Sequence, residues 1–176
     1  MKQSLQTAFS CSSFLLSYPE PGWREALSEL QENIDTITHD EIRTTLTSFI
    51  KQALEKTNDQ LINSYVYTFD FGKKTNLYLT YMNTGEQRER GIELLELKQH
   101  YKKAGFAVTD KELPDYLPLL LEFWANANEE DSEPIMSKYT KNIQALHGQL
   151  KEANSMYEPI IASILLAIDA WGLQTN

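Results

Sequence analysis

Cysteine is nearly absent from this chain of 176 residues, which contains Cys11 alone. One cysteine excludes an intramolecular disulfide and a metal cluster held by several thiolates. Long apolar runs are missing as well, because no stretch approaches the roughly 20 residues that a membrane-spanning helix requires. The apolar patch at 14–16 follows several serines and precedes no cleavage site of small residues, so we expect no signal peptide. These absences predict a soluble protein of the cytoplasm, with no direct membrane insertion.

Positive charge is also scarce, since 16 Lys and Arg residues stand against 25 Asp and Glu residues, a formal net charge of -9. An acidic surface is repelled by nucleic acid and by anionic lipid, so we expect neither as a partner, and a basic protein partner fits better. Acidic residues concentrate at 126–133, which we expect to be an exposed connection.

Glycine and proline are infrequent, with 7 and 6 copies, in a chain rich in helix-forming Leu, Glu, Gln, Lys and Ala. This composition favours an all-α architecture, and the length suits a single helical domain over 1–176. Apolar residues recur at helical spacing, and the expected helices cover 5–16, 23–34, 42–54, 61–69, 87–105, 116–127, 133–148 and 155–171. Capping boxes predict helix starts at Thr38 and Thr84, and Asn58 or Asp59 is expected to cap the fourth helix.

Two prolines flank Asp115 in the run ELPDYLP at 112–118. A residue that precedes a proline avoids the helical conformation, so we expect a new helix to begin at Asp115. With Asp115 as the N-cap, Pro118 occupies the third helical position, where its missing N–H has no intrahelical partner to lose. Asp115 would accept the Leu117 N–H and keep part of its carboxylate free, which predicts a negative group at a helix mouth.

Patterns of catalytic chemistry are missing. His39, His100 and His147 lie on different expected elements, and none has a His, Cys or carboxylate neighbour at metal-ligand spacing. The run GKKT at 72–75 lacks the earlier glycine of a phosphate loop, and no nucleophile elbow or dinucleotide fingerprint is present. We therefore expect no catalytic residue, no bound metal and no stably bound cofactor. A nucleotide-binding or hydrolytic protein is the least supported alternative.

Asp70 lies in the run FDFG at 69–72, which has the letters of a kinase motif without the rest of that fold. Two interpretations are open. Asp70 caps the next turn with Gly72 in a left-handed conformation, or its carboxylate lies on the wall of a groove. Arg88 and Arg90 are interpreted as a solvated helix face that pairs weakly with neighbouring glutamates.

Aromatic residues concentrate at 65–81, where Tyr, Val, Thr and Phe also favour strands, although we expect helix. Aromatic residues at helical spacing are usually core. Tyrosine, however, also has a polar end, and an aromatic surface with a few carboxylates suits an apolar peptide that bears Arg or Lys. Recognition of a helix in a groove requires this combination.

Four blocks carry a more specific signal, namely YVYTFD at 65–70, TNLYLTY at 75–81, GEQRERG at 85–91 and ELPDYLP at 112–118. In order and approximate spacing they resemble the NarJ family, the assembly chaperones or delta subunits of respiratory nitrate reductase. The resemblance extends from about Ser4 to the C-terminal helix. It implies an all-helical fold like that of the TorD-type redox-enzyme maturation chaperones.

The resemblance also implies a function, namely binding the N-terminal segment of the apo catalytic alpha subunit while the molybdenum cofactor is inserted, and then leaving the mature enzyme. The cofactor, bis-molybdopterin guanine dinucleotide, would belong to the client. The family's signature positions here are Asp70, Arg88, Arg90, Gly91, Pro114, Asp115 and Pro118. Our candidates for client-peptide binding are Tyr67, Asp70, Asp115 and Tyr116.

Two positions depart from the family, since Tyr116 and Met82 stand where some members have His, which argues against a mechanism that needs imidazole there. The alternative function is a generic helical protein-protein adaptor without a maturation role. A homodimer is compatible with either function, because helical proteins of this kind can exchange elements between protomers.

Overall fold

The computed structural model describes residues 1–82 and 87–173, and those residues contain eight α-helices and no strand. The helices are α1 (Lys2–Leu15), α2 (Leu27–Asp35), α3 (Asp40–Leu54), α4 (Asn58–Tyr65), α5 (Gln87–Lys103), α6 (Leu117–Asn126), α7 (Glu129–Glu152) and α8 (Glu158–Trp171). The all-α prediction is confirmed. No helix within the described ranges is long and apolar enough to span a bilayer.

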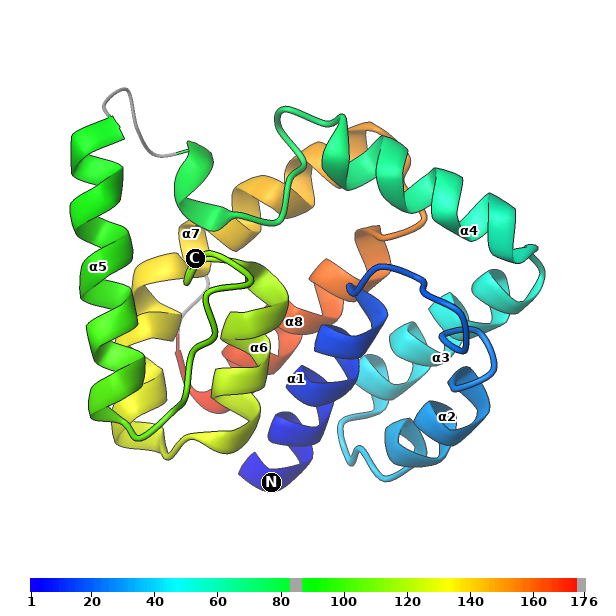
Figure 1. Cartoon of the computed structure of the whole chain (residues 1–176). Coiled ribbons are helices and arrows are strands. Elements are labelled where there is room, and N and C mark those ends of the chain that lie inside the picture. The colour runs from blue at the N-terminus through cyan, green and yellow to red at the C-terminus, as the bar shows by residue number, and fades with distance from the viewer. Residues whose placement is uncertain (83–86, 174–176) are drawn as a thin grey trace.

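Helices α1 and α8 lie at the centre of the molecule (Figure 1). Helix α1 packs on α6 and α8, and α8 also packs on α3 and α7. Aromatic rings join the central helices, because the Phe9 ring lies 5.6 Å from that of Trp124 and 6.1 Å from that of Trp171. Helices α2 and α3 cover one side of this centre, and α5 stands at the opposite edge (Figure 1).

Several helix starts differ from the predicted ones. The Thr38 N–H donates to the Ser4 hydroxyl, and His39 caps α3 instead, so the capping box predicted at Thr38 is wrong. Thr57 caps α4 in a reciprocal capping box with Gln60, just before the two residues that we expected as caps. The second predicted box, at Thr84, lies outside the described residues.

The acidic stretch 126–133 is not a connection. Asn128 caps α7 by accepting the Asp131 N–H, and the helix starts at Glu129. Three acidic residues then occupy the first turn, where the positive end of the helix dipole stabilises carboxylates. Charge density alone therefore misassigned this segment, because acidic residues are typical of exposed connections and of helix N-termini alike.

The predicted helix through 65–81 ends early. Helix α4 gives way to a π-helical turn, η1 (Val66–Asp70), and a short 3-10 helix, η2 (Leu79–Met82), follows only after an extended piece. Pairing with the segment before α6 keeps this piece extended, because the Leu117 N–H donates to the Leu77 carbonyl at 2.8 Å and the Leu79 N–H to the Asp115 carbonyl at 3.2 Å. Tertiary hydrogen bonds thus override the local helical preference.

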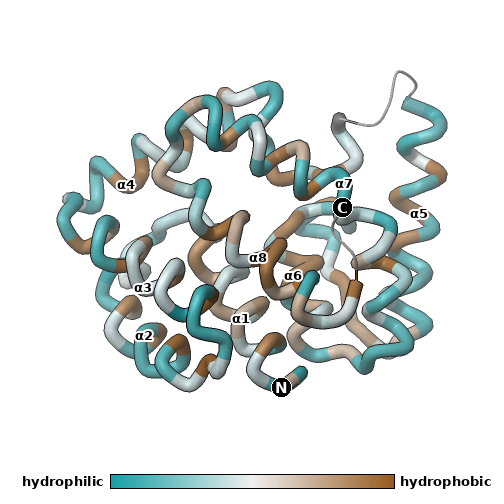
Figure 2. Tube along the Cα trace, turned by 180° about the vertical axis from the view of Figure 1, so that it is seen from behind, coloured by the Kyte–Doolittle hydropathy of each residue, from teal (hydrophilic) through white to brown (hydrophobic). Residues whose placement is uncertain are grey.

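Helix α5 divides its apolar residues between two sides. Leu97 and Tyr101 are buried, as the predicted stripe requires, whereas Ile92 and Leu95 are 53% and 56% exposed. Figure 2 shows hydrophobic positions, in brown, along α5 at the edge of the molecule. The structure therefore leaves an apolar pair on the outer side of this edge helix.

Candidate functional site

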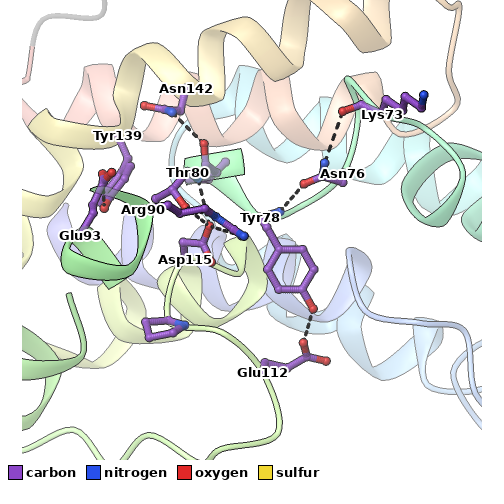
Figure 3. A network of polar contacts seen from close by, with 12 residues as sticks. Lys73, Asn76, Tyr78, Thr80, Arg90, Glu93, Glu112, Asp115, Tyr139 and Asn142 are labelled. Atoms are coloured by element: carbon purple, nitrogen blue, oxygen red, sulfur yellow. Dashed lines mark hydrogen bonds and ion pairs between the residues drawn. The ribbon is translucent and has the colours of Figure 1, made fainter. Parts of the chain in front are cut away.

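Asp115 occupies the centre of a buried polar network between three segments (Figure 3). Its Oδ2 atom accepts hydrogen bonds from the Thr80 N–H at 3.0 Å and from the Thr80 hydroxyl at 2.7 Å. Arg90, on α5, donates through Nε to the Thr80 hydroxyl oxygen at 3.0 Å, and its Nη2 lies 3.6 Å from Asp115 Oδ2. Asp115 therefore joins η2, the start of α5 and the approach to α6.

The predicted role of Asp115 as a helix cap is wrong. Tyr116 is the N-cap residue of α6, and the Leu117 N–H that Asp115 was expected to accept donates to the Leu77 carbonyl. Pro118 falls at the second helical position, which still spares its missing N–H. The carboxylate of Asp115 is fully buried, so it does not face solvent at a helix mouth.

Tyr116 belongs to a cluster of tyrosines beside this network. Its hydroxyl lies 3.2 Å from that of Tyr65, and its ring centroid lies 5.0 Å from that of Tyr78. The Tyr78 hydroxyl in turn donates to Glu112 (Figure 3). Burial is the main cause that raises the pKa of both Tyr65 and Tyr116, so both hydroxyls are neutral near pH 7. Tyr116 is half-buried.

Tyr67 is different, because its side chain is 79% exposed on η1. Phe71, four residues further along, is 77% exposed. Both rings line a cleft with a volume of about 430 Å³. The lining residues come from the connection between α3 and α4, from α4 and η1, from the turn after η1, and from the last turn of α7 with the segment that follows it. They are Lys56, Ser64, Tyr67, Thr68, Phe71, Gly72, Thr75, Leu150, Ala153, Asn154, Ser155 and Met156.

The four candidate residues are therefore not gathered on one surface. Tyr67 lines the cleft, Asp70 is exposed beside it without lining it, and Asp115 and Tyr116 belong to the buried network and its tyrosine cluster. Sequence reasoning missed Phe71, although its spacing of four from Tyr67 was a usable signal for a shared helical face. Nothing in the sequence indicated that the end of α7 would form the other wall of the cleft.

Gly72 does not adopt the left-handed conformation that one interpretation of Asp70 required, since the described glycines with positive φ are Gly22, Gly105 and Gly172. A Cβ atom at Gly72 would instead collide with the Thr68 carbonyl oxygen and the Thr75 hydroxyl, which are hydrogen-bonded to each other. Close packing, and not backbone torsion, is the reason for glycine at this position.

The remaining signature residues fall into a buried group and an exposed group. Pro114 and Pro118 are buried, and their carbonyls accept hydrogen bonds from the Tyr101 hydroxyl at 2.8 Å and the Ser13 hydroxyl at 2.7 Å. Arg88 and Gly91 are exposed on α5. The two prolines are therefore part of the fold.

The histidines have local structural roles. His147 Nε2 lies 2.6 Å from Glu158 Oε1, and His100 Nε2 lies 2.9 Å from the Asp131 carbonyl oxygen. Within the described part of the chain, no three His, Cys, Asp or Glu side chains are grouped closely enough to hold a metal ion. The arrangement offers a cleft and a buried network, and no constellation for acid-base or nucleophilic chemistry.

Comparison with known proteins assigns the chain to a family. The family model described as Nitrate reductase delta subunit matches residues 19–161. The chain belongs to this family. A relative from Bacillus subtilis, named probable nitrate reductase molybdenum cofactor assembly chaperone NarJ, is 46% identical over 171 residues, which cover 97% of this chain and 93% of that protein. The resemblance read from the four sequence blocks is confirmed.

Other relatives match over less of their own length. The nitrate reductase molybdenum cofactor assembly chaperone NarJ of Escherichia coli is 30% identical over 101 residues, 57% of this chain and 43% of that protein. The nitrate reductase-like protein NarX of Mycobacterium tuberculosis is 34% identical over 164 residues, 93% of this chain and 24% of that protein. The relatives from Bacillus subtilis and Escherichia coli are both named as chaperones, in agreement with the prediction that the chain is not an enzyme.

Proposed function

We propose that this protein is an assembly chaperone that binds the catalytic alpha subunit of nitrate reductase in the cytoplasm while the molybdenum cofactor is inserted. The observation that carries the proposal is the 46% identity to a protein named as such a chaperone over 97% of this chain. The chaperone holds the N-terminal segment of the apo subunit and leaves the mature enzyme. The cofactor, bis-molybdopterin guanine dinucleotide, belongs to the client.

The surface that we assign to the client is the cleft beside Tyr67 and Phe71. Two aromatic rings that are more than three-quarters exposed are unusual on a monomer, because their hydration is unfavourable. Covering each ring contributes about 2–3 kcal/mol before ordering costs are subtracted. Asp115 and Tyr116 support this surface only indirectly, by holding the extended segment that follows it.

Calorimetry with a synthetic peptide of the alpha-subunit N-terminus tests the proposal. We expect binding by the unaltered chain and at least tenfold weaker binding by the double variant Tyr67→Ala, Phe71→Ala. The control is Ile92→Ala, Leu95→Ala, which removes a second exposed apolar pair, on α5. Absence of heat with the unaltered chain would remove the proposal, whereas weakening by the control pair alone would move the site to α5.

A cellular experiment separates a maturation chaperone from a generic adaptor. Deletion of the gene should lower both nitrate reductase activity and the molybdenum content of the purified alpha subunit. An adaptor without a maturation role predicts an unchanged molybdenum content.

A further inference from the structure

Lys56 is the one charged side chain among the described residues that line the cleft. Its backbone is fixed, because its carbonyl oxygen accepts a hydrogen bond from Arg24 Nε at 3.1 Å. Its ammonium group forms no ion pair with a described residue. On a chain with a net charge of -9, an unpaired cation among the residues that line this aromatic cleft is notable. A carboxylate on a bound ligand would complete the pair.

Asn154, on the opposite wall, points to the same chemistry. It follows α7 with φ of 52°, and it is the one described residue other than glycine with positive φ. The Asn154 N–H donates to the Lys151 carbonyl and the Ser155 N–H to the Leu150 carbonyl, the pair of bonds that ends a helix with a left-handed residue. Glycine is the usual residue at that position and asparagine is the common alternative, and here asparagine brings a side-chain amide to the lining of the cleft.

We infer that the cleft binds a client segment in which an acidic side chain stands next to an apolar or aromatic one. The Lys56 ammonium pairs with the carboxylate, the Asn154 amide donates a hydrogen bond to it, and Tyr67 and Phe71 cover the apolar neighbour. This inference rests on the proposed function and specifies the chemistry of its ligand. It also refines the expectation of a basic partner. The net negative charge of the chain governs the long-range approach of a basic client, whereas Lys56 recognises one acidic side chain of that client at short range.

The geometry favours a peptide acid over a nucleotide. Residues 153–156, at the C-terminal end of α7, form one wall of the cleft, and a helix C-terminus carries partial negative charge. One lysine balances one carboxylate there, whereas a polyphosphate would leave several charges uncompensated. The described residues that line the cleft form no glycine-rich cradle of backbone N–H groups, because Gly72 is the one glycine among them.

The test uses fluorescein-labelled peptides that tile the N-terminal segment of the alpha subunit, with every Asp and Glu replaced in turn by Asn or Gln. We expect one replacement to weaken binding about tenfold, and Lys56→Met to weaken the unaltered peptide by a similar factor. The two changes together should cause little further loss, because they remove the same pair. Lys141→Met, an exposed lysine of α7, is the control for the altered net charge.

Asn154→Gly separates a binding role from a structural one, because a purely structural role would not change peptide affinity while stability is kept. This variant should melt at the same or a higher temperature than the unaltered chain and yet bind the peptide several-fold more weakly. The inference is overturned if Lys56→Met and Asn154→Gly bind normally while Tyr67→Ala, Phe71→Ala does not, an outcome that leaves the proposed function intact. A bound peptide without an acid, or a thermal shift with GTP or ATP that Lys56→Met abolishes, overturns it as well. If the unaltered chain binds no peptide, both the inference and the proposed function fail.

Discussion

The guanidinium of Arg90 lies 3.6 Å from the fully buried carboxylate of Asp115, and Thr80 bridges the two side chains. This relationship connects η2, α5 and the approach to α6, which are separated along the chain by residues outside the described ranges and by a loop. It assigns two signature residues to the fold.

Replacing the buried carboxylate tests this assignment. Asp115→Asn keeps an acceptor for Thr80 but leaves Arg90 without its charge partner, so we expect a loss of about 2 kcal/mol in the free energy of unfolding. For a chain of this size that corresponds to a melting temperature lower by roughly 4–8 °C. Peptide affinity of the folded protein should be unchanged. Asp110→Asn is the control, because that carboxylate pairs with Lys98 while its side chain is 93% exposed, and the change should be nearly neutral. Intact stability together with lost affinity would return Asp115 to the binding site.

Two glycine substitutions should change the free energy of unfolding in opposite directions. Gly72→Ala places a Cβ against the Thr68 carbonyl and the Thr75 hydroxyl, so we expect destabilisation by about 1–3 kcal/mol. Gly91→Ala meets no atom within 4 Å on the exposed side of α5, so it should stabilise the helix by about 0.5–1 kcal/mol. Urea unfolding measures both. A destabilising Gly91→Ala would show that α5 packs closely against another surface in solution.

Cys11 should resist modification in the native state. Burial raises the pKa of its thiol to about 11, so thiolate is scarce at pH 8, and the side chain is also inaccessible. Iodoacetamide at pH 8 should therefore leave the native chain unlabelled for hours and label it within minutes in guanidinium chloride, as mass spectrometry would show. Rapid labelling of the native chain would mean that α1 opens readily.

Alkaline pH should unfold the protein cooperatively. Burial is the main cause that raises the pKa of Tyr65, Tyr101, Tyr139 and Tyr157 above the ordinary value near 10. Above about pH 10 the unfolded chain loses these protons while the native chain keeps them, so the unfolded state binds fewer protons and stability falls as pH rises. Each such tyrosine lowers the free energy of unfolding by about 1.4 kcal/mol per pH unit.

The stability that these tyrosines contribute is fully present below pH 10 and is lost between pH 10 and their raised native values. Circular dichroism and phenolate absorbance recorded together between pH 9 and 12 check this. The part of the phenolate absorbance that comes from these four buried tyrosines should rise in the same transition in which the helices melt. Phenolate absorbance that is complete before the helices melt would show that these hydroxyls are open to solvent.

Much of the helical architecture was predictable, because burial in a helix leaves a pattern in the sequence itself. Phe9 and Trp124 lie on apolar stripes of period 3.6 that match α1 and α6 in the structure. Local hydrogen bonds were less predictable. Thr38, which has the residues of a capping box, binds Ser4 of α1, a partner distant in sequence, and His39 caps α3 instead.

The candidate site was predictable only in part, for the same reason. Tyr67 emerged from local aromatic spacing and does line a cleft, whereas Lys56 and Asn154 carry no local signal, because the chain brings them together only when α3, α4 and α7 pack. Asp115 was recognised as unusual from its flanking prolines, but its partners Thr80 and Arg90 are distant in sequence.

The sequence by itself determined the helical class, most of the helix positions and the family, since these depend on residue periodicity and on blocks of adjacent residues. Only the tertiary structure decided that the Asp115 carboxylate is buried and that the rings of Tyr67 and Phe71 are exposed. The physical reason is that exposure and charge pairing depend on which segments pack together. Packing brings together residues that are distant in sequence, and a local sequence pattern does not specify those contacts.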